Sequence, residues 1–218
     1  MSQKHTFLES EGDAWYERNR LAAIEDPSTE IILKLLNGIG AAPKRILEIG
    51  CSSGYRLAKL ENAFGAECHG IDPSAKAIFE GKIRYPALNL RQGTADELNY
   101  DIGYFDLVFF GFCLYLCDPS DHFKIAWQTD RILAEQSLVI IKDFFPAHPH
   151  RNPYSHRDAV FSYKMDFSNM FLWHPAYSLL SRSYLEHGSP LTFDPAERVV
   201  TDLIRKDLGT GFPLPPRS

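Results

Sequence analysis

The sequence predicts a doubly wound α/β domain with a mostly parallel seven-stranded sheet, an N-terminal helical arm and a C-terminal antiparallel hairpin. Three observations support this prediction. Short apolar runs alternate with helically spaced apolar residues between positions 44 and 143, a glycine-rich turn follows the first run, and two strand-like stretches flank a turn after position 189. The length of 218 residues fits a single domain, 1–218.

Residues 1–43 are expected to form the helical arm, which we interpret as a lid ahead of the core. Residues 8–23 predict a polar helix, and Gly12 moves its start towards Asp13 because glycine disfavours helix. The stretch IILKLLNGIG has helically spaced apolar residues and predicts a second helix, which ends at Gly38 or Gly40.

Residues 44–143 carry the predicted core. The runs RILEI and FDLVFF are apolar enough for strands buried on both faces, whereas Leu57, Leu60 and Phe64 recur at helical spacing. The full prediction comprises strands at 45–49, 66–71, 88–92, 105–110 and 137–142, separated by helices at 55–64, 74–83 and 118–133.

The pattern changes in residues 144–208, which we expect to cap the substrate side and close the sheet. Residues 144–158 are rich in Pro, His and Arg and predict a long loop, which an aromatic segment follows. The stretch 174–188 predicts a helix closed by Gly188. Two closing strands, 190–193 and 198–205, then flank the turn 194–197, and residues 209–218 predict a mobile tail.

Composition excludes several classes of protein. The 28 acidic and 23 basic residues give a net charge of -5, so a nucleic-acid partner is not expected. No apolar run reaches the ~18 residues of a membrane span, and the polar N-terminal stretch lacks the apolar run of a secretory signal. We expect a cytoplasmic protein, a monomer or homodimer, that acts on a small molecule.

The cysteines do not predict a metal site. Cys51, Cys68, Cys113 and Cys117 form no CxxC pair, and no histidine lies at finger spacing from them. We therefore expect reduced, buried thiols and no bound metal.

The turn after the first strand has the composition of a ligand-binding loop. Gly50 and Gly54 enclose three small residues, so the backbone can bend sharply and a ligand can approach closely. The GxGxxG pattern of dinucleotide enzymes is absent, and the acid Glu48 just before the turn would repel a pyrophosphate. Glu48 instead favours a ligand that carries a positive charge, such as an ammonium or a sulfonium.

A second acid, Asp72, ends the next predicted strand about 22 residues after Gly50. An acid at this distance typically accepts hydrogen bonds from the hydroxyls of a ribose in such folds. The pair of acids therefore predicts a nucleoside ligand with a positively charged end.

These residues resemble motifs of the class I S-adenosylmethionine-dependent methyltransferases. The resemblance rests on ILEIGCSSGY, HGIDPS, QGTADEL and FDLVFFGFCLYL, which occur in the family's order between about residues 44 and 143. It implies a Rossmann-like fold, S-adenosyl-L-methionine as cofactor and S-adenosyl-L-homocysteine as its product.

The same resemblance implies the cofactor-binding residues. They are Glu48, Gly50, Cys51, Ser52, Gly54, Asp72, Pro73, Ser74, Thr94, Ala95, Asp96, Phe110, Gly111 and Phe112. Two positions depart from the family pattern: Ser52 replaces the middle glycine of the turn, and Thr94 stands where many members carry an acid. Which of Thr94, Asp96 and Glu97 faces the adenine stays open.

Methyl transfer to a neutral acceptor needs a group that takes up a proton. We expect His150 and His156 as candidate bases, with Asp143 as an orienting or alternative base, because these groups follow the fifth strand. A solvated loop is the alternative interpretation of this stretch. The candidate substrate-binding residues are Trp15, Tyr16, Arg18, Tyr115, Arg151, Tyr163, Lys164 and Trp173, although aromatic residues in this number are also typical of a core.

The sequence predicts transfer of a methyl group to an O or N atom of a small polar molecule. The aromatic segment at 162–177 loosely resembles methyltransferases of bacterial sugar and polysaccharide modification, so a sugar or acidic metabolite is one candidate acceptor. Two rivals stay open: an NAD(P)-dependent oxidoreductase of similar layout, and a cofactor-binding relative without catalysis.

Overall fold

The computed structural model of the protein describes residues 2–25, 28–186 and 194–214. Within them, a seven-stranded sheet has the order β3-β2-β1-β4-β5-β9-β8, in which only β9 pairs antiparallel, with β5 and with β8. Its strands are β1 (Arg45–Ile49), β2 (Glu67–Asp72), β3 (Asn89–Gln92), β4 (Phe105–Gly111), β5 (Leu133–Phe144), β8 (Tyr177–Glu186) and β9 (Arg198–Asp207). The predicted fold class is confirmed.

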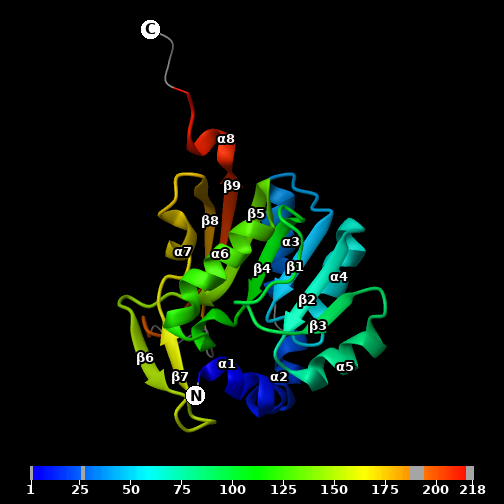
Figure 1. The fold of residues 1–218 in the computed structure, drawn as a ribbon, viewed down its shortest axis with the longest axis vertical. Coiled ribbons are helices and arrows are strands. Elements are labelled where there is room, and N and C mark those ends of the chain that lie inside the picture. The colour runs from blue at the N-terminus through cyan, green and yellow to red at the C-terminus, as the bar shows by residue number, and fades with distance from the viewer. Residues whose placement is uncertain (1, 26–27, 187–193, 215–218) are drawn as a thin grey trace.

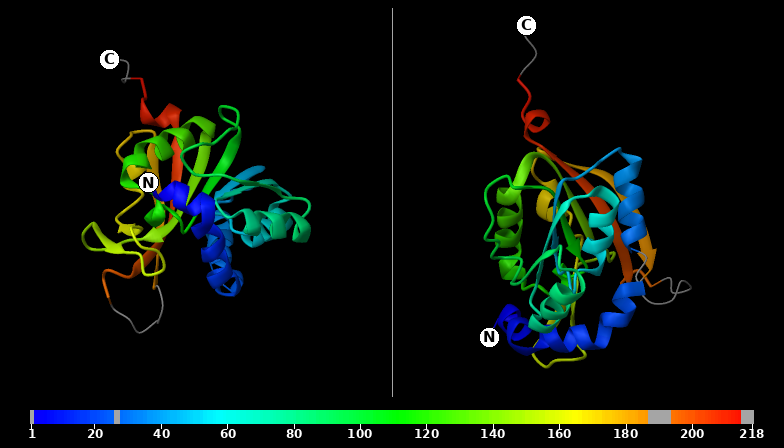
Figure 2. Two further views of the ribbon diagram at one scale, coloured as in Figure 1. Left: turned by 60° about the horizontal axis from the view of Figure 1, so that its bottom comes forward. Right: turned by 90° about the vertical axis from the view of Figure 1, so that its right-hand side faces the viewer.

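Helices cover both faces of this sheet (Figure 2). They are α1 (Gln3–Thr6), α2 (Gly12–Glu25), α3 (Ser28–Gly38), α4 (Tyr55–Phe64), α5 (Ala75–Arg84), α6 (His122–Ile132), α7 (Asn169–Leu172) and α8 (Leu208–Gly211). A π-helical turn, Phe7–Glu11, joins α1 to α2. Two 3₁₀ turns, Leu114–Leu116 and Pro119–Asp121, lie between β4 and α6.

The alternation of side chains along each strand divides the core into two clusters. Leu107 and Phe109 of β4 pack on the face covered by α3, α4 and α5, whereas Val108 and Phe110 pack on the face covered by α6 and α7. All four are fully buried. The central strands are therefore apolar on both faces, as the run FDLVFF predicts.

The strand order reverses between β1 and β4. β1 continues to β2 and β3 on one side, and β4 continues to β5 on the other, so the connections that leave β1 and β4 diverge at their carboxyl ends. Ligands of open α/β sheets bind at such a switch point. Figure 1 shows α1 and α2 lying below these strand ends.

The N-terminal helix begins earlier than the sequence predicts. Helix α2 begins at Gly12, next to the expected start near Asp13, but helical backbone already runs from Gln3 through the π-helical turn up to it. Gly12 has a packing role: a Cβ there would lie 3.0 Å from the Ser74 nitrogen and 3.1 Å from the Pro73 carbonyl carbon. Glycine is needed at this position for close approach to β2 and α5, and it does not end the helix.

The C-terminal third also departs from the prediction. Residues 177–186, predicted as helix, form the edge strand β8, which pairs with β9. The predicted strand 190–193 lies outside the described residues. The expected long loop contains β6 (His150–Pro153), which pairs with β7 (Phe161–Lys164) in a separate two-stranded sheet.

Among the helices that the structure describes, none combines the length and the apolar character that a membrane crossing requires.

Candidate functional site

A cavity lies at the carboxyl ends of β1, β2 and β4, beneath the N-terminal helix. It encloses about 950 Å³ of empty space, part of it open to solvent. Its wall combines residues from the strand ends, the turns between β4 and α6 and the N-terminal helix: Lys4, Phe7, Gly12, Trp15, Ile49, Gly50, Ser52, Tyr55, Arg56, Ile71, Asp72, Pro73, Gly93, Thr94, Ala95, Asp96, Gly111, Phe112, Cys113, Leu116, Cys117, Asp118, Asp121 and Ile125. Nine of the fourteen predicted cofactor residues are in this wall.

The turn after β1 is held in a left-handed conformation at three alternate positions. Gly50, Ser52 and Gly54 have φ angles of 75°, 51° and 80°. Ser52 therefore adopts a conformation that favours glycine, which explains why the usual residue at this point of the turn is glycine. The Ser52 hydroxyl is buried and has no hydrogen-bond partner among the described residues, although Ser52 lines the cavity.

Asp72 connects the two turns that border the cavity. Its carboxylate accepts hydrogen bonds from the Ser52 nitrogen at 2.8 Å and from the Ser74 nitrogen at 2.9 Å. Burial raises the pKa of Asp72 to about 6, against the lowering effect of these two bonds. A carboxylate of this kind lines the cavity as an acceptor for further donors.

Glu48 lies behind the cavity wall, and Arg56 stands between it and the cavity. The Glu48 carboxylate is fully buried and accepts from the Arg56 Nε at 2.6 Å. The Arg56 Nη2 also donates to the carbonyl oxygens of Gly50 and Gly111, each at 3.2 Å. Burial raises the pKa of Glu48, and the charge of Arg56 opposes that rise. The second Glu48 oxygen has no hydrogen-bond partner among the described residues.

Gly111 makes this ion pair possible. A Cβ on Gly111 would lie 2.2 Å from the Arg56 Nη2 and 2.6 Å from the Glu48 Oε1, so no other residue fits without displacing the pair. Arg56 was not among the residues predicted from the sequence. One signal was present: a cation in the first turn of a helix opposes the helix dipole unless an acid lies nearby, and Glu48 is that acid.

The opposite end of the cavity is built around Asp96. Its carboxylate accepts from the Lys4 Nζ at 2.7 Å, from the Lys124 Nζ at 3.0 Å and from the Thr94 hydroxyl at 2.8 Å. Burial raises the pKa of Asp96, but these three donors outweigh burial and lower it to about 2. Asp96 is therefore ionised, and its carboxylate is bound by these three donors. Ala95 lies beside it in the wall.

An aromatic cluster forms the side of the cavity next to β4 and β5. Phe112 has a φ of 67°, and its ring lies 5.0 Å from the rings of both Tyr115 and Phe144, measured between centroids. Asp143 lies below this cluster, where its carboxylate accepts from the nitrogens of Leu114 and Phe144 at 2.9 and 2.8 Å. Burial raises the pKa of Asp143 to about 7. Asp143 holds the 3₁₀ turn and does not line the cavity.

The remaining predicted cofactor residues support the wall from behind. Cys51 and Phe110 are buried in the two core clusters, and Gly54 packs on Leu88 and Leu90 at the start of α4. The Ser74 hydroxyl accepts from the Ala77 nitrogen at 2.9 Å and thereby caps α5.

The first four predicted substrate residues, Trp15, Tyr16, Arg18 and Tyr115, lie on the N-terminal helix or in contact with it. Trp15 lines the cavity, and its side chain reaches Tyr115, whose pKa burial raises well above the ordinary value. Tyr16 donates to Glu80 at 2.7 Å, away from the cavity, and Arg18 bridges Glu11 and Tyr154 at 2.5 and 3.0 Å.

The second group comes from the substrate-side cap and lies outside the cavity wall. Lys164 is paired with Glu197, the Arg151 guanidinium lies over Phe161, and Trp173 is 74% exposed. Tyr163 is partly buried on β7.

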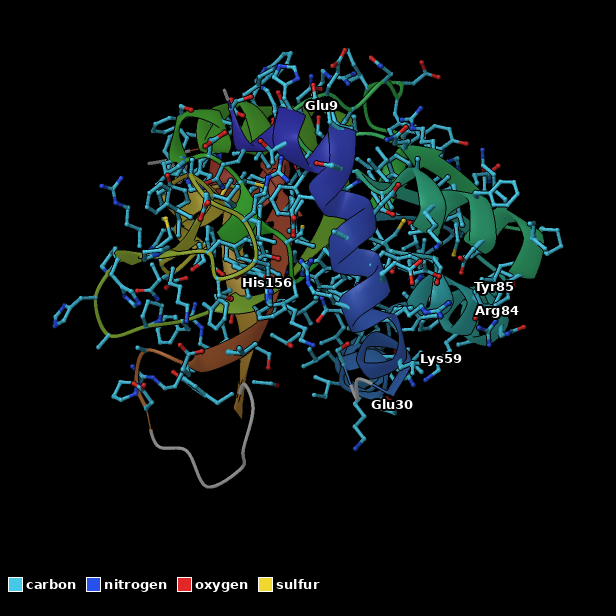
Figure 3. The ribbon with its side chains drawn as sticks, turned by 90° about the horizontal axis from the view of Figure 1, so that it is seen from below. Glu9, Glu30, Lys59, Arg84, Tyr85 and His156 are labelled. Atoms are coloured by element: carbon cyan, nitrogen blue, oxygen red, sulfur yellow. The ribbon has the colours of Figure 1, made fainter. Side chains whose placement is uncertain are left out.

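The two histidines proposed as bases are not in the cavity wall either. His150 contacts the His148 carbonyl oxygen at 2.9 Å, and the exposed His156 lies edge-on to Tyr154. Figure 3 shows His156 to one side of the N-terminal helix as that helix crosses the lower face.

The wall residues that the sequence analysis missed come mainly from distant segments. Lys4 and Phe7 approach from the N-terminal helix, and Asp118, Asp121 and Ile125 approach from the segment after β4. Lys4 and Asp96 are 92 positions apart, so no local spacing could have paired them.

Comparisons with known proteins agree with this geometry. Residues 46–136 match the sequence profile of a family described as a methyltransferase domain. An uncharacterized methyltransferase of Synechocystis sp. is 28% identical over 127 residues, which span 57% of this chain and 59% of that relative.

Two solved structures share the fold over nearly the whole chain. A 1,6-didemethyltoxoflavin-N1-methyltransferase of Burkholderia thailandensis, with S-adenosylhomocysteine bound, has a TM-score of 0.69 at 15% identity and covers 94% of this chain and 87% of its own. The N-methyltransferase NodS of Bradyrhizobium japonicum, also with S-adenosylhomocysteine, has a TM-score of 0.66 at 17% identity and covers 94% and 99%. Residues 46–136 therefore match a methyltransferase domain, and the fold around them is the one found in two methyltransferases that bind S-adenosylhomocysteine.

Proposed function

We propose that this chain transfers the methyl group of S-adenosyl-L-methionine to a nitrogen atom of a small molecule. The observation that supports it most is the cavity at the switch point, whose wall joins the Asp72 carboxylate, the left-handed turn and the Arg56 guanidinium. Cofactor-bound structures of two relatives with this fold support the choice of cofactor.

The residues of the cavity fit this cofactor. The Ser52 hydroxyl lines the cavity, is buried and has no hydrogen-bond partner among the described residues, which suits a polar ligand end near the turn. Asp72 would accept from the ribose hydroxyls, and Asp96 and the backbone of Ala95 would border the adenine. When bound, the cofactor would supply an electrophilic methyl group, and Phe112 would be one of the residues that border it.

The chain's own residues would orient the reactants and exclude water. Trp15 and Phe7 cover the cavity from the N-terminal helix, and the Phe112 ring is fixed between Tyr115 and Phe144. A fixed acceptor in a covered site needs little further ordering to reach an in-line geometry.

A nitrogen acceptor is favoured because each aspartate in the described part of the cavity wall already accepts a hydrogen bond or forms an ion pair, so none is available as a base. Asp72 accepts two backbone hydrogen bonds and Asp96 accepts two lysines. Asp118 accepts the Gln3 nitrogen at 2.8 Å, and Asp121 pairs with Lys4 at 3.1 Å. An amine or ring nitrogen with a free lone pair needs no base before it attacks, whereas an alcohol does.

Isothermal titration with S-adenosylhomocysteine and with NAD tests the proposed function. We expect binding of the first and none of the second, because the turn lacks the pyrophosphate-binding pattern. Tighter binding of NAD would instead support the oxidoreductase rival.

The affinity for S-adenosylhomocysteine should fall as the pH drops through about 6. Only the ionised Asp72 accepts both ribose hydroxyls, and its pKa is raised to about 6, so the binding form is lost below that value. At pH 5 we expect affinity about tenfold weaker than at pH 8. Titration calorimetry at several pH values checks this, and Asp72→Asn should flatten the profile.

Replacing both His150 and His156 with alanine distinguishes a nitrogen acceptor from an acceptor that needs a histidine as its base. With a nitrogen acceptor we expect turnover within about twofold of the unchanged protein, because neither ring lines the cavity. The assay measures S-adenosylhomocysteine formed from an amine panel. A loss of turnover beyond ~100-fold, with cofactor affinity intact, would return the two histidines to the role of base.

A further inference from the structure

The N-terminal helix is attached on both sides of the cavity that it covers. Four of its residues, Lys4, Phe7, Gly12 and Trp15, are in the cavity wall. Figures 1 and 3 show this helix crossing the carboxyl edge of the sheet, from the side of β7 to the side of α5. The two attachments differ in chemistry.

The attachment to α5 is compact and largely buried. Asp13 accepts from the Ser74 hydroxyl at 2.6 Å and from the Lys76 nitrogen at 3.0 Å. The Tyr16 ring is buried, and Gly12 lies against the backbone of Pro73 and Ser74. This end therefore has the character of a permanent anchor.

The other attachment is mainly polar and includes hydrogen bonds from Gln3 to Asp118 and to the Leu116 carbonyl oxygen, at 2.8 and 2.9 Å. The Lys4 ammonium lies between Asp96 at 2.7 Å and Asp121 at 3.1 Å, and the Lys4 side chain is 30% exposed. The Gln3 side chain exchanges hydrogen bonds with the backbone of Phe161, at 3.1 and 2.6 Å. Among residues 2–11 the buried apolar side chain is Phe7, which packs beside Tyr154, so polar contacts supply most of this attachment and salt or the loss of Lys4 weakens it more than the anchor.

The π-helical turn, Phe7–Glu11, lies between the two attachments. Its looser hydrogen-bond pattern is the point at which a helix of this length bends most readily. Residues 2–11 can therefore swing away while residues 12–16 stay in place.

We propose that Lys4 is a positioning residue: by clamping residues 2–11 to Asp96 and Asp121, it controls how long the nucleoside cofactor stays bound. This inference rests on the proposed function, since it takes a nucleoside as the occupant of the cavity. The clamp closes over the Asp96 end, so its loss speeds escape of the ligand and leaves the Asp72 contacts unchanged.

Lys124 provides a matched control. Its ammonium reaches the same Asp96 oxygen at 3.0 Å, but it extends from α6 and does not hold the N-terminal helix. Lys4→Met and Lys124→Met therefore remove the same charge from the same carboxylate, and only the first frees the helix.

The experiment measures dissociation of radiolabelled S-adenosylhomocysteine after dilution into excess unlabelled ligand. We expect Lys4→Met to release it about fivefold faster than the unchanged protein, Lys124→Met within twofold, and Lys4→Arg to restore slow release. Rising salt should speed release from the unchanged protein and have little effect on Lys4→Met. Hydrogen exchange of the free proteins should show faster exchange at residues 2–11 in Lys4→Met alone.

The outcomes separate this inference from the proposed function. If the unchanged protein binds S-adenosylhomocysteine but Lys4→Met and Lys124→Met release it at the same rate, the clamp is overturned and the function stands. If the unchanged protein does not bind it, the proposed function fails and the clamp fails with it.

Discussion

Replacing Asp72 with asparagine should weaken the binding of S-adenosylhomocysteine at least tenfold. Asparagine keeps the shape of the side chain and one carbonyl oxygen, but it removes the charge and one of the two acceptors. A lost pair of charge-assisted hydrogen bonds at a buried site costs at least ~1.5 kcal/mol. Titration calorimetry at pH 8, where Asp72 is ionised, measures the change.

Asp106→Asn is the matched control for this experiment. The Asp106 carboxylate also accepts two backbone hydrogen bonds, from the nitrogens of Lys44 and Arg45 at 2.9 Å each. Asp106 is near the amino end of β4, whereas the cavity lies at the carboxyl ends of the strands, so cofactor affinity should not change. If Asp72→Asn binds within twofold of the unchanged protein, Asp72 does not hold the ribose.

Replacing Arg56 with methionine should lower the free energy of unfolding by about 3–5 kcal/mol at pH 8. Methionine fills much of the space of Arg56 but leaves the fully buried Glu48 without its counter-charge. Below the raised pKa of Glu48 the carboxyl is protonated, so the loss should shrink at pH 5. Urea unfolding at the two pH values measures both effects.

Lys59→Met, one turn further along α4, supplies the control. Lys59 pairs with Glu30 at 3.3 Å, but both side chains are about half exposed, so its loss should cost under ~1 kcal/mol. The double variant Glu48→Gln with Arg56→Met should recover part of the lost stability, because no buried charge then remains. A cost for Arg56→Met equal to that of Lys59→Met would mean that the buried pair is not structural.

The central part of the fold was predictable because local signals and tertiary packing agree there. β1 and α4 have the predicted bounds, 45–49 and 55–64, since the apolar run, the glycine turn and the helical spacing all mark the same boundaries. The strand order and the cavity at its switch point follow from that alternation.

Residues 177–186 show where the sequence was ambiguous. Tyr177, Leu180 and Tyr184 recur at spacings of three and four, which a helix would place on one face. The segment forms a strand because it pairs with β9, about twenty residues further along the chain. A register shift between Leu179 and Ser181 accommodates the imperfect alternation of its side chains. Such long-range pairing has no signature within the segment itself.

The site was predictable where its residues belong to consecutive motifs and unpredictable where distant segments meet. Asp72 and Ser52 follow from the spacing of two motifs, and both line the cavity. The contacts of Lys4 depend on how the N-terminal helix crosses the sheet, which no motif records. The inward turn of Arg56 depends equally on the missing side chain of Gly111.

Two separate parts of the sequence form the cavity. Its floor comes from residues 46–136, the part that matches the methyltransferase-domain profile, whereas its roof comes from residues 4–15, which precede that part. A substitution in the roof therefore changes the cover of the cavity without altering any residue that matches the profile.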